Sequence, residues 1–287
     1  MGIRRKLAGV AVVIGAMGAL VACNGAAVLN SITPSGAFSK TDDITYGPLP
    51  RHTLDVYRAD TPMPGAPTVV FVHGGSWSEG SKDIYKFVGD AFASEGFDVV
   101  IPNYRLFPEA RYPDMVSDTA RAGAWAVEEF ARPVVLIGHS AGGYNVLQAV
   151  FAPEVSAEAG LDVCASVAGV VGLAPPTGAY ELTDEPYITI FPDRFLGDSA
   201  PLFRAERGQT DVPPLLLAHG ADDTTVGPKN SEDLAALTGA ELRVYEGRNH
   251  IDTVKLLSRF FDDDETLKSD ILTWIAALDT AGPFCGR

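Results

Sequence analysis

Ser140 is the first residue whose surroundings are typical of chemistry. An apolar run, VVLI, leads directly into GHSAG, and a helix-like segment follows. A serine on a tight turn between a strand and a helix is presented above the sheet, and Gly138 and Gly142 would let the strand and the helix approach each other. We therefore expect Ser140 to be a nucleophile. A turn that only requires small residues is the alternative.

A serine hydroxyl needs a general base, and His250 is the best placed of the five histidines. It follows the last strand-like segment and is the only histidine after the candidate acids. Serine, acid, histidine is the chain order of one class of strand–turn–helix serine enzymes. The acid comes from HGADDTTV, where Asp222 and Asp223 both follow a strand and either could orient the imidazole.

The sequence HGGSW, residues 73–77, is suited to stabilising negative charge. Glycines at the end of a strand let backbone N–H groups approach an oxyanion that develops during acyl transfer. The N–H of Ala141, directly after the serine, would complete such a site. Whether Gly74, Gly75 or Ser76 provides the second N–H is open from the residues alone, and a simple glycine turn is the alternative.

Strand-like and helix-like segments alternate from about residue 40 onward, which predicts an α/β fold with a mostly parallel sheet covered by helices on both faces. Ligands of such sheets bind beyond the carboxyl ends of the strands. Four strand-like segments end in HGGSW, GHSAG, HGADDTT and EGRNH, so we expect these loops to meet. The strand-like segments are 52–59, 68–75, 97–106, 133–140, 163–173, 213–220 and 241–247, and the helix-like ones are 86–96, 112–131, 141–152, 229–239 and 264–278.

Residues 174–212 interrupt this alternation. They contain five prolines and mix aromatic with charged side chains. Because long insertions in compact domains are usually functional, we expect a lid or specificity segment over the strand ends, with a plain surface excursion as the alternative.

The set HGGSW, NYRLFPEARYPDMVSDTARAGAW, GHSAGG, HGADDTTV and NH resembles the α/β-hydrolase fold over about residues 50–280. The sequence is similar to hormone-sensitive-lipase-like esterases and to kynurenine-formamidase-like hydrolases. The resemblance implies Asp223 as the acid, since relatives often read H-G-x-x-D-x-x-V, and Gly74 and Gly75 as oxyanion donors. It implies hydrolysis of small acyl esters by an acyl-enzyme route, without metal or cofactor. The chain has HGGS where lipase-like relatives have HGGG. This difference favours the formamidase-like branch.

Two functional alternatives remain beside the esterase. One is an amidase of the arylformamidase type. The other is a non-catalytic envelope lipoprotein that binds a ligand. The formal net charge of −15 makes nucleic-acid binding improbable, because a polyanion repels phosphates. No His, Cys or carboxylate cluster has the spacing of a metal site. The oligomeric state cannot be read from the sequence.

The N-terminus predicts export and a lipid anchor. A basic start and an apolar stretch too short to span a membrane precede Leu-Val-Ala-Cys, which resembles a bacterial lipobox. We expect residues 1–22 to be a signal peptide, Cys23 to carry the lipid, residues 23–39 to be a tether, and residues 40–287 to be the catalytic domain. Asn24 suggests an outer-membrane address facing the periplasm, where a disulfide between Cys164 and Cys285 is allowed.

Overall fold

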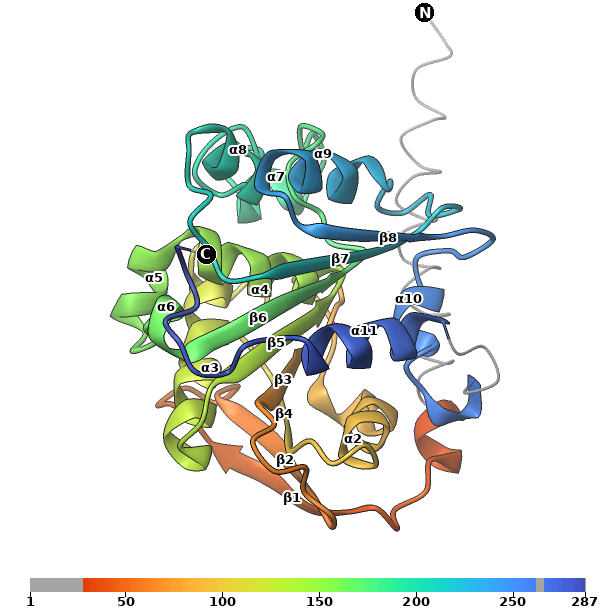
Figure 1. The fold of residues 1–287 in the computed structure, drawn as a ribbon. Helices are drawn as coiled ribbons and strands as arrows, with labels where there is room; N and C mark the ends of the chain where they lie inside the picture. The colour runs from red at the N-terminus through yellow and green to blue at the C-terminus, as the bar shows by residue number, and fades with distance from the viewer. Residues whose placement is uncertain (1–27, 262–265, 287) are drawn as a thin grey trace, which may run out of the picture.

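The computed structural model describes residues 28–261 and 266–286, and these residues form one central sheet (Figure 1). Its eight strands lie in the order β1-β2-β4-β3-β5-β6-β7-β8. Only β2 runs against its neighbours, so the sheet is mostly parallel as the sequence predicts. The strands are β1 (Phe38–Thr45), β2 (Thr53–Ala59), β3 (Thr68–Val72), β4 (Val99–Pro102), β5 (Val134–His139), β6 (Val167–Leu173), β7 (Leu215–Gly220) and β8 (Glu241–Tyr245).

Helices cover both faces of this sheet, and the strand residues alternate between the two layers. Val70 and Val72 pack in one buried cluster, with α3 and α4, whereas Val69 and Phe71 pack in the other, with α2 and α11. Strands buried on both faces read as continuous apolar runs, which is why the central strands are recognisable in the sequence. The main helices are α2 (Lys86–Ala93), α3 (Asp114–Phe130), α4 (Ala141–Phe151), α5 (Pro153–Glu158), α9 (Lys229–Thr238) and α11 (Thr266–Ala276).

Short helical elements complete the described chain. Two 3-10 turns and four short helices lie in the connections: η1 (Lys82–Ile84), α6 (Val163–Ser166), α7 (Tyr187–Ile190), α8 (Pro201–Glu206), α10 (Asp252–Lys255) and η2 (Arg259–Phe261). The strand predicted at 163–173 therefore begins as a helix, because Asp162 accepts a hydrogen bond from the N–H of Ala165 and caps α6. Across 28–261 and 266–286, every helix is too short or too polar to cross a bilayer.

The expected domain start at residue 40 is too late. Residues 28–32 are helical, and β1 begins at Phe38. Asn30 donates a side-chain hydrogen bond to the carbonyl of Asp83 and accepts one from the N–H of Phe87, so this segment is attached to the domain. For residues 23–27 the tether stays a prediction, because these residues, Cys23 included, lie outside the described ones. The predicted signal peptide, residues 1–22, lies outside them as well.

A disulfide joins Cys164, in α6, to Cys285 near the end of the chain. The N–H of Phe284 also donates a 2.7 Å hydrogen bond to the carbonyl of Cys164. The C-terminal tail is therefore attached beside the start of β6, on the side of the sheet away from the strand ends that carry the site.

Candidate active site

Ser140 lies on the turn between β5 and α4, where its backbone is strained. Its φ of 54° and ψ of −120° place a non-glycine residue in a region that L-residues rarely adopt. The flanking glycines are needed at this turn: a Cβ on Gly138 would lie 2.2 Å from the carbonyl oxygen of Gly142. A Cβ on Gly142 would lie 2.1 Å from the carbonyl oxygen of Val72. The structure thus presents Ser140 on a strained turn that only small neighbours allow.

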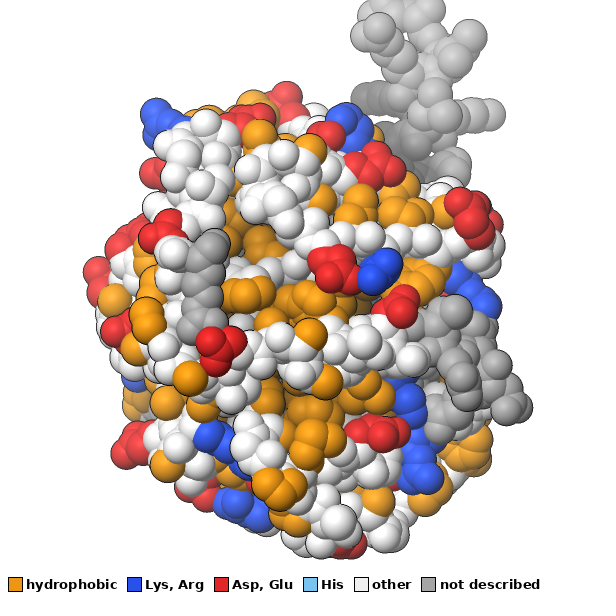
Figure 2. All heavy atoms as spheres, viewed as in Figure 1, with side chains coloured by type: hydrophobic (Ala, Val, Ile, Leu, Met, Phe, Trp, Pro, Cys, Tyr) orange, Lys and Arg blue, Asp and Glu red, His pale blue; other side chains and the backbone are white. Residues whose placement is uncertain are grey.

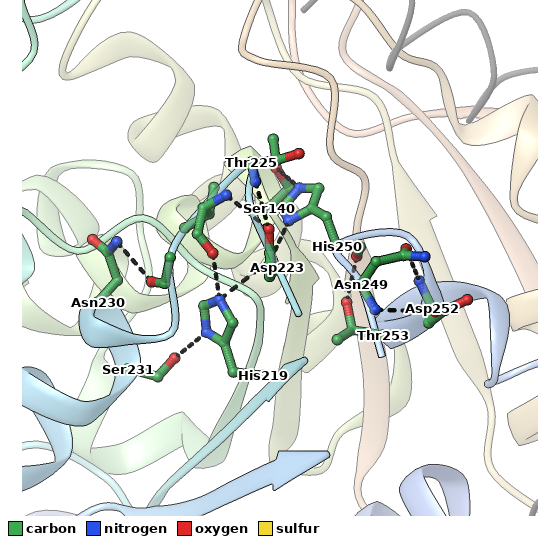
Figure 3. Close-up of polar contacts among 12 residues, drawn as sticks. Ser140, His219, Asp223, Thr225, Asn230, Ser231, Asn249, His250, Asp252 and Thr253 are labelled. Carbon is green, nitrogen blue, oxygen red and sulfur yellow. Dashed lines mark hydrogen bonds and ion pairs between the residues drawn. The ribbon is translucent and has the colours of Figure 1, made fainter. Parts of the chain in front are cut away.

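The structure brings Ser140, His250 and Asp223 together from three separate loops (Figure 3). His250 Nε2 lies 2.9 Å from Ser140 Oγ, and His250 Nδ1 lies 2.7 Å from Asp223 Oδ2. Asp223 follows β7 and His250 follows β8, so neighbouring parallel strands deliver the two side chains to the same edge. With Nδ1–H donating to the carboxylate, Nε2 can accept the serine proton.

Asp223 is the aspartate that reaches the histidine, while Asp222 is exposed. Burial works against the charged form of Asp223, but hydrogen bonds from His219 and His250 hold its pKa well below its usual range. Its Oδ1 also accepts the backbone N–H groups of Thr225 at 2.8 Å and Val226 at 2.9 Å. The carboxylate is therefore ionised and rigidly oriented.

His219 also contacts the acidic side chain: its Nε2 lies 3.3 Å from Asp223 Oδ2. His219 is buried, with Nε2 2.7 Å from the carbonyl oxygen of Val226 and Nδ1 2.7 Å from Ser231 Oγ. His73 lies under the glycine loop with Nδ1 2.7 Å from the carbonyl oxygen of Gly74, and burial lowers its pKa to about 4. His73 is thus a structural residue.

His139 makes a contact that the sequence did not predict. Its Nε2 lies 3.0 Å from the carbonyl oxygen of His250. Residue spacing holds no signal for this bond, because the two histidines are 111 positions apart and meet only when β5 and the loop after β8 are in place.

The HGGSW loop lies beside Ser140, and its residues have distinct positions. A Cβ on Gly74 would lie 3.2 Å from Ser140 Cβ, so glycine permits the close approach. Gly75 has a φ of +124°, and a Cβ there would strike the carbonyl oxygen of Glu79. Ser76 and Ala141 line the cavity at Ser140, whereas neither glycine does. The assignment of Gly74 and Gly75 as oxyanion donors beside Ala141 stays a prediction.

A cavity of about 230 Å³ opens at Ser140. Aromatic and aliphatic side chains dominate its wall, and among the described residues that line it none is charged. Five of these residues come from the 174–212 segment, which therefore covers the strand ends. The lining residues are Ser76, Trp77, Ser140, Ala141, Pro176, Tyr180, Leu182, Tyr187, Phe195, Thr225, Val226, Gly227 and Asn230.

Asn230 connects the 174–212 segment to the loop of the acid. Its Oδ1 accepts the N–H of Thr177 at 2.9 Å, and its Nδ2 donates to the carbonyl of Gly227 at 3.1 Å. On the opposite wall, Trp77 donates from Nε1 to Asn145 Oδ1 at 3.0 Å and packs edge-on against Phe191. Both walls of the cavity are thus held by buried hydrogen bonds.

The surface carries charges of both signs. On the face shown in Figure 2, acidic and basic side chains are interspersed and no continuous basic patch is present. Within the described part of the chain, no three His, Cys, Asp or Glu side chains come together as metal ligands would. The cavity at Ser140 is the candidate active site, because Ser140 lines it and is hydrogen-bonded to His250.

Known proteins with similar sequences include several hydrolases. Residues 54–185 match the BD-FAE family. Esterase LipC of Mycobacterium tuberculosis is 31% identical over 64% of this chain and 51% of its own length. The isoprenylcysteine alpha-carbonyl methylesterase ICME of Arabidopsis thaliana is 27% identical over 83% of this chain and 62% of its own. The kynurenine formamidase of Danio rerio is 25% identical over 81% of both chains.

Solved structures agree on the fold. Esterase B from Lactobacillus rhamnosis superposes with a TM-score of 0.73 at 16% identity, covering 91% of this chain and 92% of that one. A carbohydrate esterase from gut microbiota superposes with a TM-score of 0.66 at 17% identity, covering 85% and 99%. This chain spans between half and two thirds of LipC and of the plant methylesterase. The chain has the α/β-hydrolase fold, and the relatives to which it is similar include carboxylic ester hydrolases.

Proposed function

We propose that the protein is a serine hydrolase that cleaves carboxylic esters through an acyl-enzyme intermediate. One observation carries the proposal: Ser140 Oγ, His250 and Asp223 form a continuous hydrogen-bonded chain, with distances of 2.9 and 2.7 Å, at the wall of a cavity. In this arrangement Ser140 is the nucleophile, His250 the general base and Asp223 the residue that orients the base.

The reaction has two steps. His250 Nε2 takes the hydroxyl proton while Ser140 Oγ attacks the ester carbonyl, and the resulting oxyanion accepts hydrogen bonds from Ala141 N–H and the 74–76 loop. His250 then protonates the leaving alcohol, which departs. Water enters, His250 takes its proton, and the acid is released from Ser140 by the same route in reverse. Asp223 stabilises the imidazolium in both steps.

The cavity supports small to medium, uncharged acyl groups as substrates. A lining without charged side chains offers a carboxylate or ammonium no partner, and taking an ion out of water without one costs several kcal/mol. The names of the methylesterase and of LipC agree with an ester substrate.

An arylformamidase-type amidase is the second candidate. The kynurenine formamidase of Danio rerio matches over 81% of both chains, which is a more even coverage than that of the methylesterase. The same three residues would then attack a formamide carbonyl. Comparing kcat/KM for N-formylkynurenine and for p-nitrophenyl esters distinguishes the two activities.

The direct test uses the full chain purified in detergent, with p-nitrophenyl acetate as substrate. We expect steady turnover in the wild type and none above background in Ser140→Ala, while circular dichroism shows the same fold for both. Equal turnover in the two proteins would refute the proposal, and so would a folded wild type that cleaves neither p-nitrophenyl esters nor N-formylkynurenine.

We also propose that the protein is a lipoprotein of the bacterial outer membrane, facing the periplasm and anchored through Cys23. The lipobox-like sequence carries this proposal. Labelling cells with radioactive palmitate tests it: label should enter the wild type and be lost in Cys23→Ser. A labelled Cys23→Ser protein would contradict the anchor.

A further inference from the structure

His139 occupies an unusual position for a buried histidine. It directly precedes Ser140, yet its ring lies beside the ring of His250, with centroids 4.9 Å apart. Its Nε2 lies 3.0 Å from the backbone carbonyl oxygen of His250. The nucleophile's turn is thus linked to the loop of the general base by a side chain that takes no part in the proposed proton transfer.

The protonation state of His139 follows from its contacts. A carbonyl oxygen can only accept, so Nε2 must carry the hydrogen of the bond to His250. Among the described residues, Nδ1 has no hydrogen-bond partner. Burial, with a smaller contribution from His250, lowers the pKa of His139 to about 3, so the ring is neutral and keeps this single donor throughout the neutral pH range.

The loop that carries His250 follows β8, the last strand of the sheet, whose side chains are half-buried or exposed. On the side of β7, the N–H of Asp222 donates a 3.0 Å hydrogen bond to the carbonyl of Arg248 in this loop. Thr253 Oγ1 also donates to the His250 carbonyl, at 2.8 Å, but Thr253 lies only three residues further along the same segment. That bond stabilises the segment internally, whereas the bond from His139 holds it against β5.

We propose that His139 is a positioning residue: by donating from Nε2 to the carbonyl oxygen of His250, it sets the distance between the general base and Ser140. This inference rests on the proposed serine hydrolase function. A side chain needed only to fill space here would be apolar, because a buried ring nitrogen without a partner is unfavourable. Proton transfer needs the base within hydrogen-bond reach, and small displacements of catalytic groups lower the rate strongly.

The test compares His139→Leu, His139→Gln and His139→Asn in the full chain. Leucine fills similar space without a donor. The glutamine amide nitrogen reaches about as far as Nε2, whereas that of asparagine is one bond shorter. We expect kcat for p-nitrophenyl acetate to fall about tenfold or more in His139→Leu and His139→Asn, with KM changed less than about twofold. His139→Gln should recover kcat to within about threefold of the wild type.

Ser156→Ala is the matched control, because Ser156 Oγ donates a buried 2.6 Å hydrogen bond to the carbonyl of Ala149, outside the site. It should lower stability without lowering kcat.

A second measurement is the rate at which a fluorophosphonate labels Ser140, which reports the reactivity of the serine without a particular substrate. If His139→Leu does not fold, the glutamine and asparagine variants provide the same contrast.

The outcomes separate the two proposals. If the wild type is active and His139→Leu or His139→Asn keeps its kcat and labelling rate, the positioning role is refuted while the hydrolase stands. Equal losses in all three folded variants, without recovery in His139→Gln, would also refute it, because the donor would then not be what matters. A folded wild type that neither turns over nor labels overturns the hydrolase and the positioning role together.

Discussion

Removing the disulfide between Cys164 and Cys285 should lower stability without lowering activity. The bond closes a loop with a sequence separation of 121 residues, which contains the acid, the base and the 174–212 segment. In the chain-entropy model, such a loop reduces the entropy of the unfolded chain by about 16 cal/mol/K, which corresponds to about 5 kcal/mol at 25 °C. This value is an upper bound, because residual structure in the unfolded chain already restricts the loop.

The assay is urea unfolding of the wild type and of a variant with both cysteines replaced by serine, at pH 7. We expect the free energy of unfolding to fall by about 2–5 kcal/mol. The denaturant slope should rise, because the unfolded chain without the link exposes more surface. At 25 °C in buffer, kcat should stay within about twofold, since the bond lies away from Ser140.

Two results would refute this reasoning. Two titratable thiols in the folded, air-oxidised wild type would show that the bond is absent. Equal free energies of unfolding for a fully oxidised wild type and the double serine variant would show that the loop is already constrained in the unfolded chain. The single variants Cys164→Ser and Cys285→Ser serve as controls, and each should be as unstable as the double variant.

Three further predictions follow from the site. Asp223→Asn should lower kcat by about 10⁴-fold, whereas Asp222→Asn should not change it, and comparable losses in both would contradict the assignment. His73 and His139 have folded pKa values of about 4 and about 3, against about 6.5 when unfolded, so the unfolded state binds more protons below pH 6.5. Above that pH the two histidines do not lower the free energy of unfolding. At pH 5 this free energy should be about 4 kcal/mol lower in urea unfolding, and an unchanged value would contradict the burial of both histidines in the neutral form. Gly142→Ala should lower stability by about 3 kcal/mol or more in thermal unfolding, and a loss below about 0.5 kcal/mol would show that the turn relaxes.

The fold class, the turn at Ser140 and the meeting of the loops around it follow from the sequence alone. These features depend on local patterns: doubly buried strands are continuous apolar runs, and the turn at Ser140 leaves no room for side chains at Gly138 and Gly142. The chain order of serine, acid and histidine then restricted the base to His250. Parallel strands deliver their carboxyl ends to one edge, so the meeting of the loops could be predicted without coordinates.

The choices that depend on contacts between distant segments required the folded chain. It placed Asp223 and not Asp222 against His250, put Ser76 on the cavity wall, and attached residues 28–39 to the domain. It also brought His139 to the carbonyl oxygen of His250. Each of these outcomes depends on contacts between segments far apart in the chain. Residue type and spacing leave such contacts open, because packing and strand register set them.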